Sequence, residues 1–232
     1  RQIVDLKAND YTIKNKTFEQ TIQVSREQIE DDEAGSAVVM ARELGRTVKA
    51  FPDELVFGLL KDGFTANGYD GVPFFGTHDN DGNGYTNLQD GGVDAGAPWF
   101  LLDPSRFIRP LILQVRREPA FTALNQNSEF EFFNNVYTWG VDTRMNAGFG
   151  LPQLAYGATT ELNEVNFDKA MQDMMSIKGE GGKPLGIRPK ILVVGPANRA
   201  AALQVVRNQF NANGGSNKNF EVVEVLVNPY LD

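Results

Sequence analysis

The stretch of the chain with the clearest potential for chemistry runs from position 78 to position 90 and reads HDNDGNGYTNLQD. A calcium-binding loop needs oxygen ligands at positions 1, 3, 5, 7, 9 and 12 and a glycine at position 6. Gly84 holds the sixth position, and the ligand positions are held by Asp79, Asp81, Asn83, the Tyr85 carbonyl, Asn87 and Asp90. The spacing therefore offers one candidate metal site.

Two features of this stretch weigh against calcium. Position 12 is Asp90, whose side chain is shorter than the glutamate that usually binds through both oxygens, and the preceding VPFFGTH has proline and glycine where a helix should enter. Asp, Asn and Gly are also the residues that turns require. The segment is therefore either a turn-rich surface loop or a specific calcium site.

The other residues that could do chemistry do not form a recognisable active site. His78 is the only histidine, so a multi-histidine metal centre is excluded, and the chain has no cysteine. The turn KGEGGKP at 178–184 departs from a phosphate loop because Ile177 replaces the first glycine and Pro184 the Ser or Thr. We therefore expect no enzyme, no catalytic residue and no cofactor.

Charged residues cluster in two places. Four arginines lie on the stretch SRFIRPLILQVRREP, and they would either contact phosphate or an acidic neighbouring subunit or form ordinary salt bridges; they are Arg106, Arg109, Arg116 and Arg117. The acidic run from Glu30 to Glu33 is either a cation site or the acidic start of a helix, where negative charge is favoured. Both pairs of alternatives stay open at this point.

Composition restricts the class of protein. The 232 residues are 41% hydrophobic and 22% charged, and no apolar run approaches the roughly 20 residues that cross a bilayer. The chain is therefore expected to work in solution, without a membrane. Its net charge of −8 argues against tight binding of nucleic acid by the chain as a whole.

The pattern of apolar residues predicts a mixed α and β protein. Residues 11–25 alternate as a half-buried strand, Ser25 and Gln28 form a capping-box pair, and a long amphipathic helix follows over 34–62, kinked or restarted at Pro52. Residues 63–98 are rich in Gly, Asp and Asn and predict a long irregular excursion.

The remaining elements are shorter. Strand-like runs are expected at 99–102, 107–115, 130–141 and 149–156. The last third predicts helices over 163–177 and 197–210 and strands over 190–194 and 220–227, a small α/β unit that begins near 157–161.

Five longer phrases resemble one family, and they occur in the family's order along essentially the whole chain. They are DDEAGSAVVMARELGRTVKAFPDELVFGLL, DGVPFFGTH, WFLLDPSRFIRPLILQVRREPAF, YTWGVDTRMNAGFGLPQLAYG and SIKGEGGKPLGIRPKILVVGP. The chain resembles the major head subunit, protein T, of Mu-like phages and prophages. That family is similar to the tailed-phage major capsid proteins of the Hong Kong 97 type.

The resemblance implies an α+β fold with a peripheral domain, a long spine helix, an extended β loop and an axial domain. Residues 1–33 would form the extended loop and the lead-in to the spine. Residues 34–157 would form the peripheral domain, with the spine at 34–62 and a long loop at 63–98, and residues 158–232 most of the axial domain. The resemblance also implies that the N-terminal arm of the family is missing or truncated in this chain, together with some of the C-terminal end.

The resemblance also implies a structural function, a major capsid protein whose copies assemble into an icosahedral shell around double-stranded phage DNA. The implied partners are other copies in hexamers and pentamers, the portal, scaffold or protease, decoration proteins, and DNA without sequence specificity. The implied location is the virion, after assembly in the host bacterial cytoplasm. Two alternatives stay open: a calcium-ordered binding module, and a non-viral nanocompartment shell of the same fold.

Overall fold

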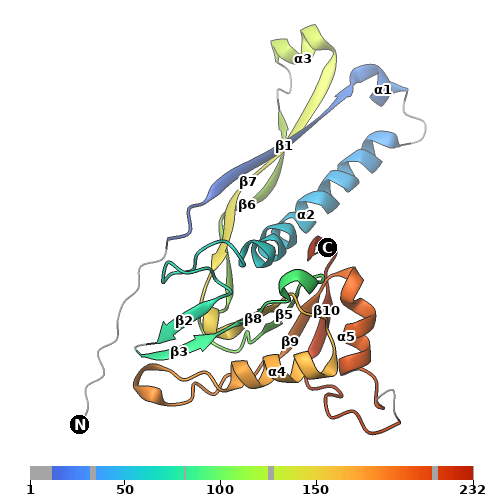
Figure 1. Ribbon diagram of the computed structural model, residues 1–232. Helices are drawn as coiled ribbons and strands as arrows, with labels where there is room; N and C mark the ends of the chain where they lie inside the picture. The colour runs from blue at the N-terminus through green and yellow to red at the C-terminus, as the bar shows by residue number, and fades with distance from the viewer. Residues whose placement is uncertain (1–11, 32–34, 81, 125–127, 211–213, 232) are drawn as a thin grey trace. The chain divides into compact units, whose positions relative to one another are not determined.

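The computed structural model describes residues 12–31, 35–80, 82–124, 128–210 and 214–231 (Figure 1). Its contacts divide the chain into two compact units. Among the described residues, unit 1 holds 56–112 and 148–231, and unit 2 holds 12–55 and 113–147. Each unit is built from segments that are far apart in the sequence.

The framework of unit 2 is a three-stranded sheet in the order β1-β7-β6. Its strands are β1 (Lys16–Ser25), β7 (Val136–Phe149) and β6 (Leu111–Leu124), of which β6 and β7 extend into unit 1 at one end. β1 runs antiparallel to β7 from Lys16 opposite Met145 to Ser25 opposite Val136. Phe18, Ile22 and Val24 of β1 are less exposed than the residues between them, which confirms the predicted half-buried strand over Lys16–Ser25.

The helices of unit 2 are α1 (Arg26–Glu30), α3 (Glu129–Asn134) and the part of α2 (Ser36–Asp62) up to Leu55. The predicted capping box is present, because the Ser25 hydroxyl accepts from the Gln28 amide and the Gln28 side chain accepts from the Ser25 amide. α2 confirms the predicted long helix, and it continues through Pro52 without restarting. Phe51 on α2 packs edge to face on Phe18 of β1, with ring centroids 4.6 Å apart.

Unit 1 is organised around a five-stranded sheet in the order β10-β9-β5-β8-β4. The strands are β4 (Leu88–Gln89), β5 (Trp99–Leu102), β8 (Ala155–Ala158), β9 (Ile191–Val194) and β10 (Glu224–Val227). β5 is antiparallel to both neighbours, whereas β10 pairs parallel with β9 and β4 parallel with β8. The central strand is therefore completed by segments that follow it by more than fifty residues.

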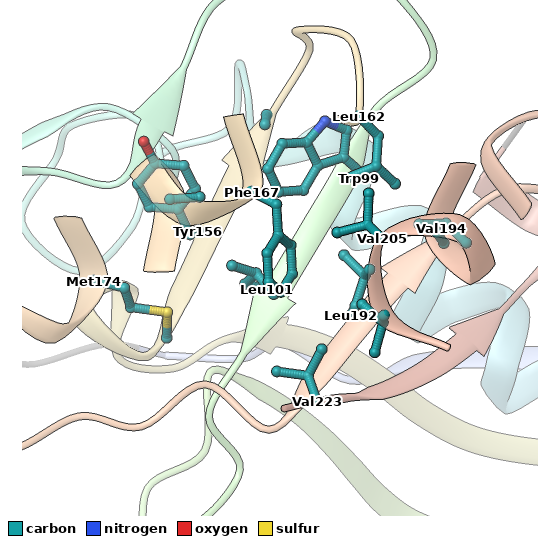
Figure 2. Close-up of a cluster of buried hydrophobic side chains, with 14 of the residues drawn as sticks. Trp99, Leu101, Tyr156, Leu162, Phe167, Met174, Leu192, Val194, Val205 and Val223 are labelled. Atoms are coloured by element: carbon teal, nitrogen blue, oxygen red, sulfur yellow. The ribbon is translucent and has the colours of Figure 1, made fainter. Parts of the chain in front are cut away.

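Side chains on the two faces of this sheet belong to two different hydrophobic clusters. On one face, Trp99 and Leu101 of β5 and Tyr156 of β8 pack with helices α4 (Glu164–Met175) and α5 (Arg199–Val206). Figure 2 shows Phe167 and Met174 of α4 and Val205 of α5 directed into this cluster. Burying each such side chain contributes about 1.5–3 kcal/mol, so this cluster holds the two helices on the sheet.

The other face of the sheet packs against a second cluster of aromatic residues. Phe100 of β5 lies with Phe75, Phe74 and Phe149, and the end of α2 contributes Leu60. Phe74 stacks on Phe149 with ring centroids 4.3 Å apart. The sheet is thus covered on both faces, which explains why its central strand is fully buried.

The expectation of a long irregular excursion over 63–98 is met only in part, since residues 63–76 and 95–98 form no regular helix or strand. This region contains an antiparallel hairpin of β2 (Thr77–Asn80) and β3 (Asn83–Thr86), the strand β4 and the short 3-10 helix η1 (Gly92–Asp94). Phe74 and Asn87 from this region are fully buried. Much of the region therefore belongs to the core of unit 1.

Four further 3-10 turns complete the chain. They are η2 (Pro152–Leu154), η3 (Glu180–Gly182), η4 (Pro196–Asn198) and η5 (Pro229–Leu231). Among the described helices, none is long and apolar enough to cross a bilayer.

Several predicted elements differ from the structure. The expected strand over 149–156 is interrupted by η2 between the end of β7 and the start of β8. The strand expected over 107–115 begins only at Leu111 and continues to Leu124, and the strand expected over 220–227 begins only at Glu224. The expected strand over 130–141 is helix α3 in its first part and strand β7 only from Val136, and the expected helix over 197–210 is shorter, since α5 ends at Val206. The predicted division into peripheral and axial domains stays a prediction, and the two compact units have different bounds.

Candidate assembly surfaces

The stretch that matches a calcium loop folds as the β2–β3 hairpin. Asp79 lies opposite Gly84 and Asn80 opposite Asn83. The Asp79 carboxylate accepts from the Gly82 amide at 2.9 Å, and the Asn83 side chain donates to the Asn80 carbonyl at 3.2 Å. Asp79 and Asn83 therefore stabilise the turn of the hairpin through local hydrogen bonds, as Asp and Asn commonly do in turns.

The later candidate ligands lie elsewhere in unit 1. The Asn87 side chain is buried and donates to the carbonyls of Phe74, Pro152 and Ala155, while its oxygen accepts from the Gly76 amide at 2.8 Å. Asn87 therefore joins three segments of the chain, a structural role that the sequence pattern did not reveal.

The final candidate ligand, Asp90, accepts from the Gly92 amide at 2.9 Å and from the Thr159 hydroxyl at 3.3 Å. Asp81 lies outside the described residues. The described part of the chain brings no three Asp, Glu, His or Cys side chains together in a metal-binding group. Calcium binding at Asp79–Asp90 thus stays a prediction, and the present hydrogen bonds of Asp79 and Asn87 would compete with it.

The single histidine has a structural environment. His78 is buried, with Nδ1 2.5 Å from an Asp70 carboxylate oxygen and Nε2 3.2 Å from the Phe74 carbonyl oxygen. Its ring stacks on Tyr85 with centroids 5.2 Å apart. Both ring nitrogens therefore have partners inside the protein, and the ring fixes the hairpin to the segment before it.

The arginine-rich stretch provides ordinary polar contacts. Arg117 forms an ion pair with Asp142, and Arg106 donates to the Leu185 carbonyl. The sequence left open whether these arginines contact phosphate or an acidic neighbouring subunit or form ordinary salt bridges. For Arg117, the ion pair with Asp142 agrees with an ordinary salt bridge. The turn at 178–184 is closed by a bridge between Lys178 and Pro184, and Gly181 and Gly182 there have positive φ angles that glycine adopts without strain.

A buried carboxylate in unit 1 was not singled out by any sequence pattern. Asp103 is 1% exposed and accepts from the backbone amides of Ser105 and Arg188, each at 3.0 Å. Burial by itself raises the pKa of this carboxyl, but the hydrogen bonds from Ser105 and Arg188 outweigh it and hold the pKa below its usual value. Asp103 thus ties the end of β5 to the segment before β9.

Other titratable groups of unit 1 are shifted by burial and by ion pairs. Burial is the largest cause that raises the pKa of Tyr85 and of Tyr156 far above the usual range for a phenol. Tyr69 and Asp70 add to the shift of the Tyr85 pKa, and the hydrogen bond to Asp173 adds to that of Tyr156. The Tyr156 hydroxyl donates to Asp173 at 2.9 Å. The hydrogen bond from Lys218 to Asp168 raises the pKa of that lysine, whose nitrogen lies 2.5 Å from the carboxylate.

Large apolar side chains are exposed in both units. Isolated exposed apolar residues are normal, but contiguous ones mark surfaces that bind other proteins. In unit 1 they include Val93, Phe107, Val165, Met175 and Phe210, and in unit 2 they include Val38, Val39, Met40, Phe121, Phe130, Phe132 and Phe133.

Three of these residues, Phe130, Phe132 and Phe133, lie on α3, between strands β6 and β7 at one end of the unit 2 sheet (Figure 1). Phe132 and Phe133 are each 77% exposed, and their rings contact each other edge to face at 5.6 Å. Three phenylalanines on a six-residue helix leave more apolar surface in water than a solitary subunit needs. Sequence reasoning placed this segment in a strand and missed this surface.

Unit 2 also has an apolar groove of about 220 Å³ between strand β1 and helix α2. Its apolar lining comes from Phe18, Val48, Phe51 and Val141, and Thr47 and Thr143 add hydroxyl groups. Together with α3, this groove gives unit 2 several apolar surfaces of the kind that protein contacts use.

Comparison with known proteins agrees with this description. The Mu-like prophage major head subunit gpT family matches residues 1–231. The chain is 37% identical over 244 aligned positions to the major capsid protein of Escherichia phage Mu, covering 100% of the chain and 80% of that protein. It is 35% identical to the Mu-like prophage FluMu major head subunit of Haemophilus influenzae, covering 93% of the chain and 73% of that protein.

Solved structures show the same fold. The capsid protein of bacteriophage JBD30 superposes with a TM-score of 0.89 at 33% identity, over 100% of this chain and 80% of that one. The JBD30 procapsid protein superposes with a TM-score of 0.80 at 45% identity, over 94% of this chain and 76% of that one. The predicted α+β capsid fold is therefore confirmed, and the chain belongs to the family of Mu-like prophage major head subunits.

Proposed function

We propose that this chain is a major capsid protein whose copies self-assemble into an icosahedral shell around double-stranded phage DNA. The observation that carries the proposal is the match to head subunits along residues 1–231, joined to a TM-score of 0.89 with the JBD30 capsid over the whole chain. A family of head subunits is structural, and the function requires no catalytic residue.

Physical features of the subunit support this function. A shell subunit must contact several neighbours at once, and exposed phenylalanines on α3 and the groove beside α2 supply apolar surface for such contacts. Individually modest contacts become stable when each copy is held through several of them. The net charge of −8 disfavours tight binding of packaged DNA, so DNA contacts would be weak and without sequence specificity.

The proposed partners follow from the shell. Copies of the chain would form hexamers and pentamers, with a portal and a scaffold or protease acting during assembly in the host bacterial cytoplasm. One JBD30 capsid structure is decorated with minor capsid protein trimers. A trimer fits where three subunits meet, so we include such decoration among the proposed partners of the assembled virion.

We also propose that the division into domains follows the capsid family. Residues 1–33 would form the extended loop and lead-in, residues 34–157 the peripheral domain and residues 158–232 most of the axial domain. The long α2 helix within 34–62 and the helix and strand pattern after residue 158 support these assignments.

Electron microscopy of the full-length protein, expressed with its assembly partners, tests the function. The expected result is closed shells, or free hexamers and pentamers. A protein that stays monomeric under these conditions would contradict the proposal.

Simple experiments distinguish the capsid function from two alternatives, a nanocompartment shell and a calcium-ordered binding module. A nanocompartment shell gene would lie beside a cargo enzyme, whereas a capsid gene would lie beside a portal and a protease. For the calcium alternative, titration calorimetry at millimolar calcium is expected to release no heat, because Asp79 and Asn87 already have hydrogen-bond partners. A binding heat that Asp79→Ala removes would instead establish a calcium-ordered hairpin.

A further inference from the structure

The outer edge of strand β3 has backbone groups without partners. In the β2–β3 hairpin, His78 lies opposite Tyr85 and Thr77 opposite Thr86. One step beyond, the Asn87 amide donates to the Gly76 carbonyl at 3.1 Å. Antiparallel strands exchange hydrogen bonds at every second pair, so the amides and carbonyls of Gly84 and Thr86 face away from β2. Within the described chain, these two residues make no backbone hydrogen bond outside the hairpin.

A groove of about 580 Å³ lies along this edge. One wall consists of Gly84, Tyr85 and Thr86 of β3, and the other consists of residues at the end of α4, among them Asp173 and Ser176. The wall opposite β3 therefore comes from a helix and not from another strand. The free edge and the groove have the shape that accepts an added strand, because an extended segment can bond to the edge while its side chains enter the groove.

The charges of the groove favour an acidic occupant. Lys169 and Lys178 both line it, and its carboxylate, Asp173, already accepts from Lys169 at 3.0 Å and from the Tyr156 hydroxyl. The two lysines and one aspartate leave the lining positive, whereas the chain as a whole carries −8. With Lys169 paired to Asp173, the lining keeps one positive charge in excess, at Lys178, and it therefore favours an acidic segment of a second copy of this acidic chain over a basic one.

An unprotected strand edge is a liability for a protein that stays single. Such edges are usually shortened, covered or charged because they pair with other chains. Here two of the four β3 residues that carry the edge are Gly84 and Thr86, neither of which is charged. A subunit that functions among many identical copies has a partner for such an edge.

We infer that the β3 edge and the groove beside α4 bind an extended segment of a second copy of this chain, which adds a strand to the β2–β3 hairpin. The inference rests on the proposed shell function. It assigns one specific contact between copies, and this contact uses backbone hydrogen bonds rather than the exposed phenylalanines of α3.

Hydrogen exchange of the wild-type full-length protein gives the first test. Exchange of the Gly84 and Thr86 amides is compared between unassembled subunits and shells that electron microscopy has identified. These amides are expected to slow by about tenfold or more in the shell, because a new backbone hydrogen bond protects them. Unchanged exchange in well-formed shells would overturn this inference while leaving the capsid function intact.

Two variants at one position give the second test. Thr86→Pro removes the outward amide, which a strand edge tolerates, whereas Thr86→Val keeps that amide and loses only the hydroxyl contact with Thr77. Thermal unfolding of the unassembled subunits checks that both variants fold. Thr86→Pro is expected to lower the shell yield about tenfold relative to Thr86→Val, and equal yields from two folded variants would overturn the inference.

The absence of cysteine from the chain allows the occupant to be identified. Thr86→Cys introduces a unique thiol, to which a benzophenone maleimide can be attached before assembly and irradiation. An adduct of doubled mass that contains peptides of two copies of this chain supports the inference. Adducts confined to one chain, or adducts with a different protein, would contradict it.

Discussion

At the scale of single residues, two buried polar side chains hold unit 1 together. Asn87 connects the segment before the hairpin to the turn before β8, and Asp103 connects the end of β5 to the segment before β9. Buried polar groups are costly unless they are satisfied, so each of these residues should be sensitive to small changes.

The substitution Asn87→Ala should lower the free energy of unfolding by about 3 kcal/mol, because it leaves the Gly76 amide and several carbonyls buried without a partner. Chemical denaturation of the unassembled subunit measures this loss. The control is Asn134→Ala, which removes an exposed bond to the Phe130 carbonyl and should change stability by less than about 0.5 kcal/mol. Equal effects of the two variants would show that Asn87 has no special role.

Asp103 predicts a dependence of stability on pH. Its folded pKa lies below its usual value, so the stabilisation is complete at neutral pH and is lost as the pH falls through the folded pKa. Asp103→Asn should lower the free energy of unfolding by about 2 kcal/mol at pH 7. The asparagine NH2 group would replace one carboxylate oxygen and would point a donor at a backbone amide that is itself a donor.

The measurement for Asp103 is denaturant unfolding between pH 7 and pH 2.5. The difference in free energy of unfolding between wild type and Asp103→Asn should be constant above about pH 5 and should become smaller below about pH 4. Asp53→Asn, an exposed change on α2, controls for altered net charge. A difference that does not depend on pH would refute the role given to the carboxylate.

At the scale of elements, close packing of β8 depends on a residue without a side chain. A Cβ atom at Gly157 would lie 2.7 Å from the ring of Phe75, which is 1% exposed. Gly157→Ala should therefore destabilise the subunit by about 1–3 kcal/mol through overpacking. Thermal unfolding measures the change.

The control for Gly157 is the same substitution on a helix. A Cβ atom added at Gly45 of α2 would have no other atom within 4 Å. Gly45→Ala should therefore raise the free energy of unfolding by about 0.5–1 kcal/mol, because alanine is the better helix former. A neutral Gly157→Ala would mean that Phe75 can move aside.

Elements with strong local signals could be predicted from the sequence, and those set by tertiary contacts could not. The periodicity of α2, the capping box at Ser25 and the apolar run of β9 each carry their own signal. α3 reads EFEFFN, whose phenylalanines favour a strand, and the short helix forms only in the connection between β6 and β7. A hairpin as short as β2–β3 is likewise set by its packing and not by its pattern.

The candidate site was harder to predict than the fold. Asp79 and Asn83 match a calcium loop because turns use the same residue types, and the sequence alone did not separate the two uses. Phe132 and Phe133 are exposed because of where the chain places α3, and phenylalanine residues in a sequence do not by themselves indicate whether they will be buried or exposed. The family resemblance supplied the function, which the spacing of chemical groups did not.

At the scale of the whole molecule, assembly should depend on apolar surface that the subunit itself does not use. The double variant Phe132→Ser with Phe133→Ser should leave the melting temperature of the unassembled subunit unchanged within about 2 °C, because both rings are largely exposed. Its shell yield should fall about tenfold or more, as expected when a central apolar contact is removed.

Electron microscopy and sedimentation measure this yield, and Glu129→Gln on the same helix serves as a control for a change of sequence at α3. Normal shells from the double variant would exclude α3 from the contacts between copies. A lower melting temperature would show that the rings contribute to the fold of the subunit.

The strand order of the unit 1 sheet has a consequence for how the protein is made. β5 lies between β8 and β9, and β9 is not synthesised until about ninety residues after β5. A chain still on the ribosome therefore exposes the WFLL strand with its edges unpaired, a state that favours aggregation and the need for chaperones. A subunit is therefore expected to be ready for assembly only after β9 and β10 have been synthesised and have completed the sheet.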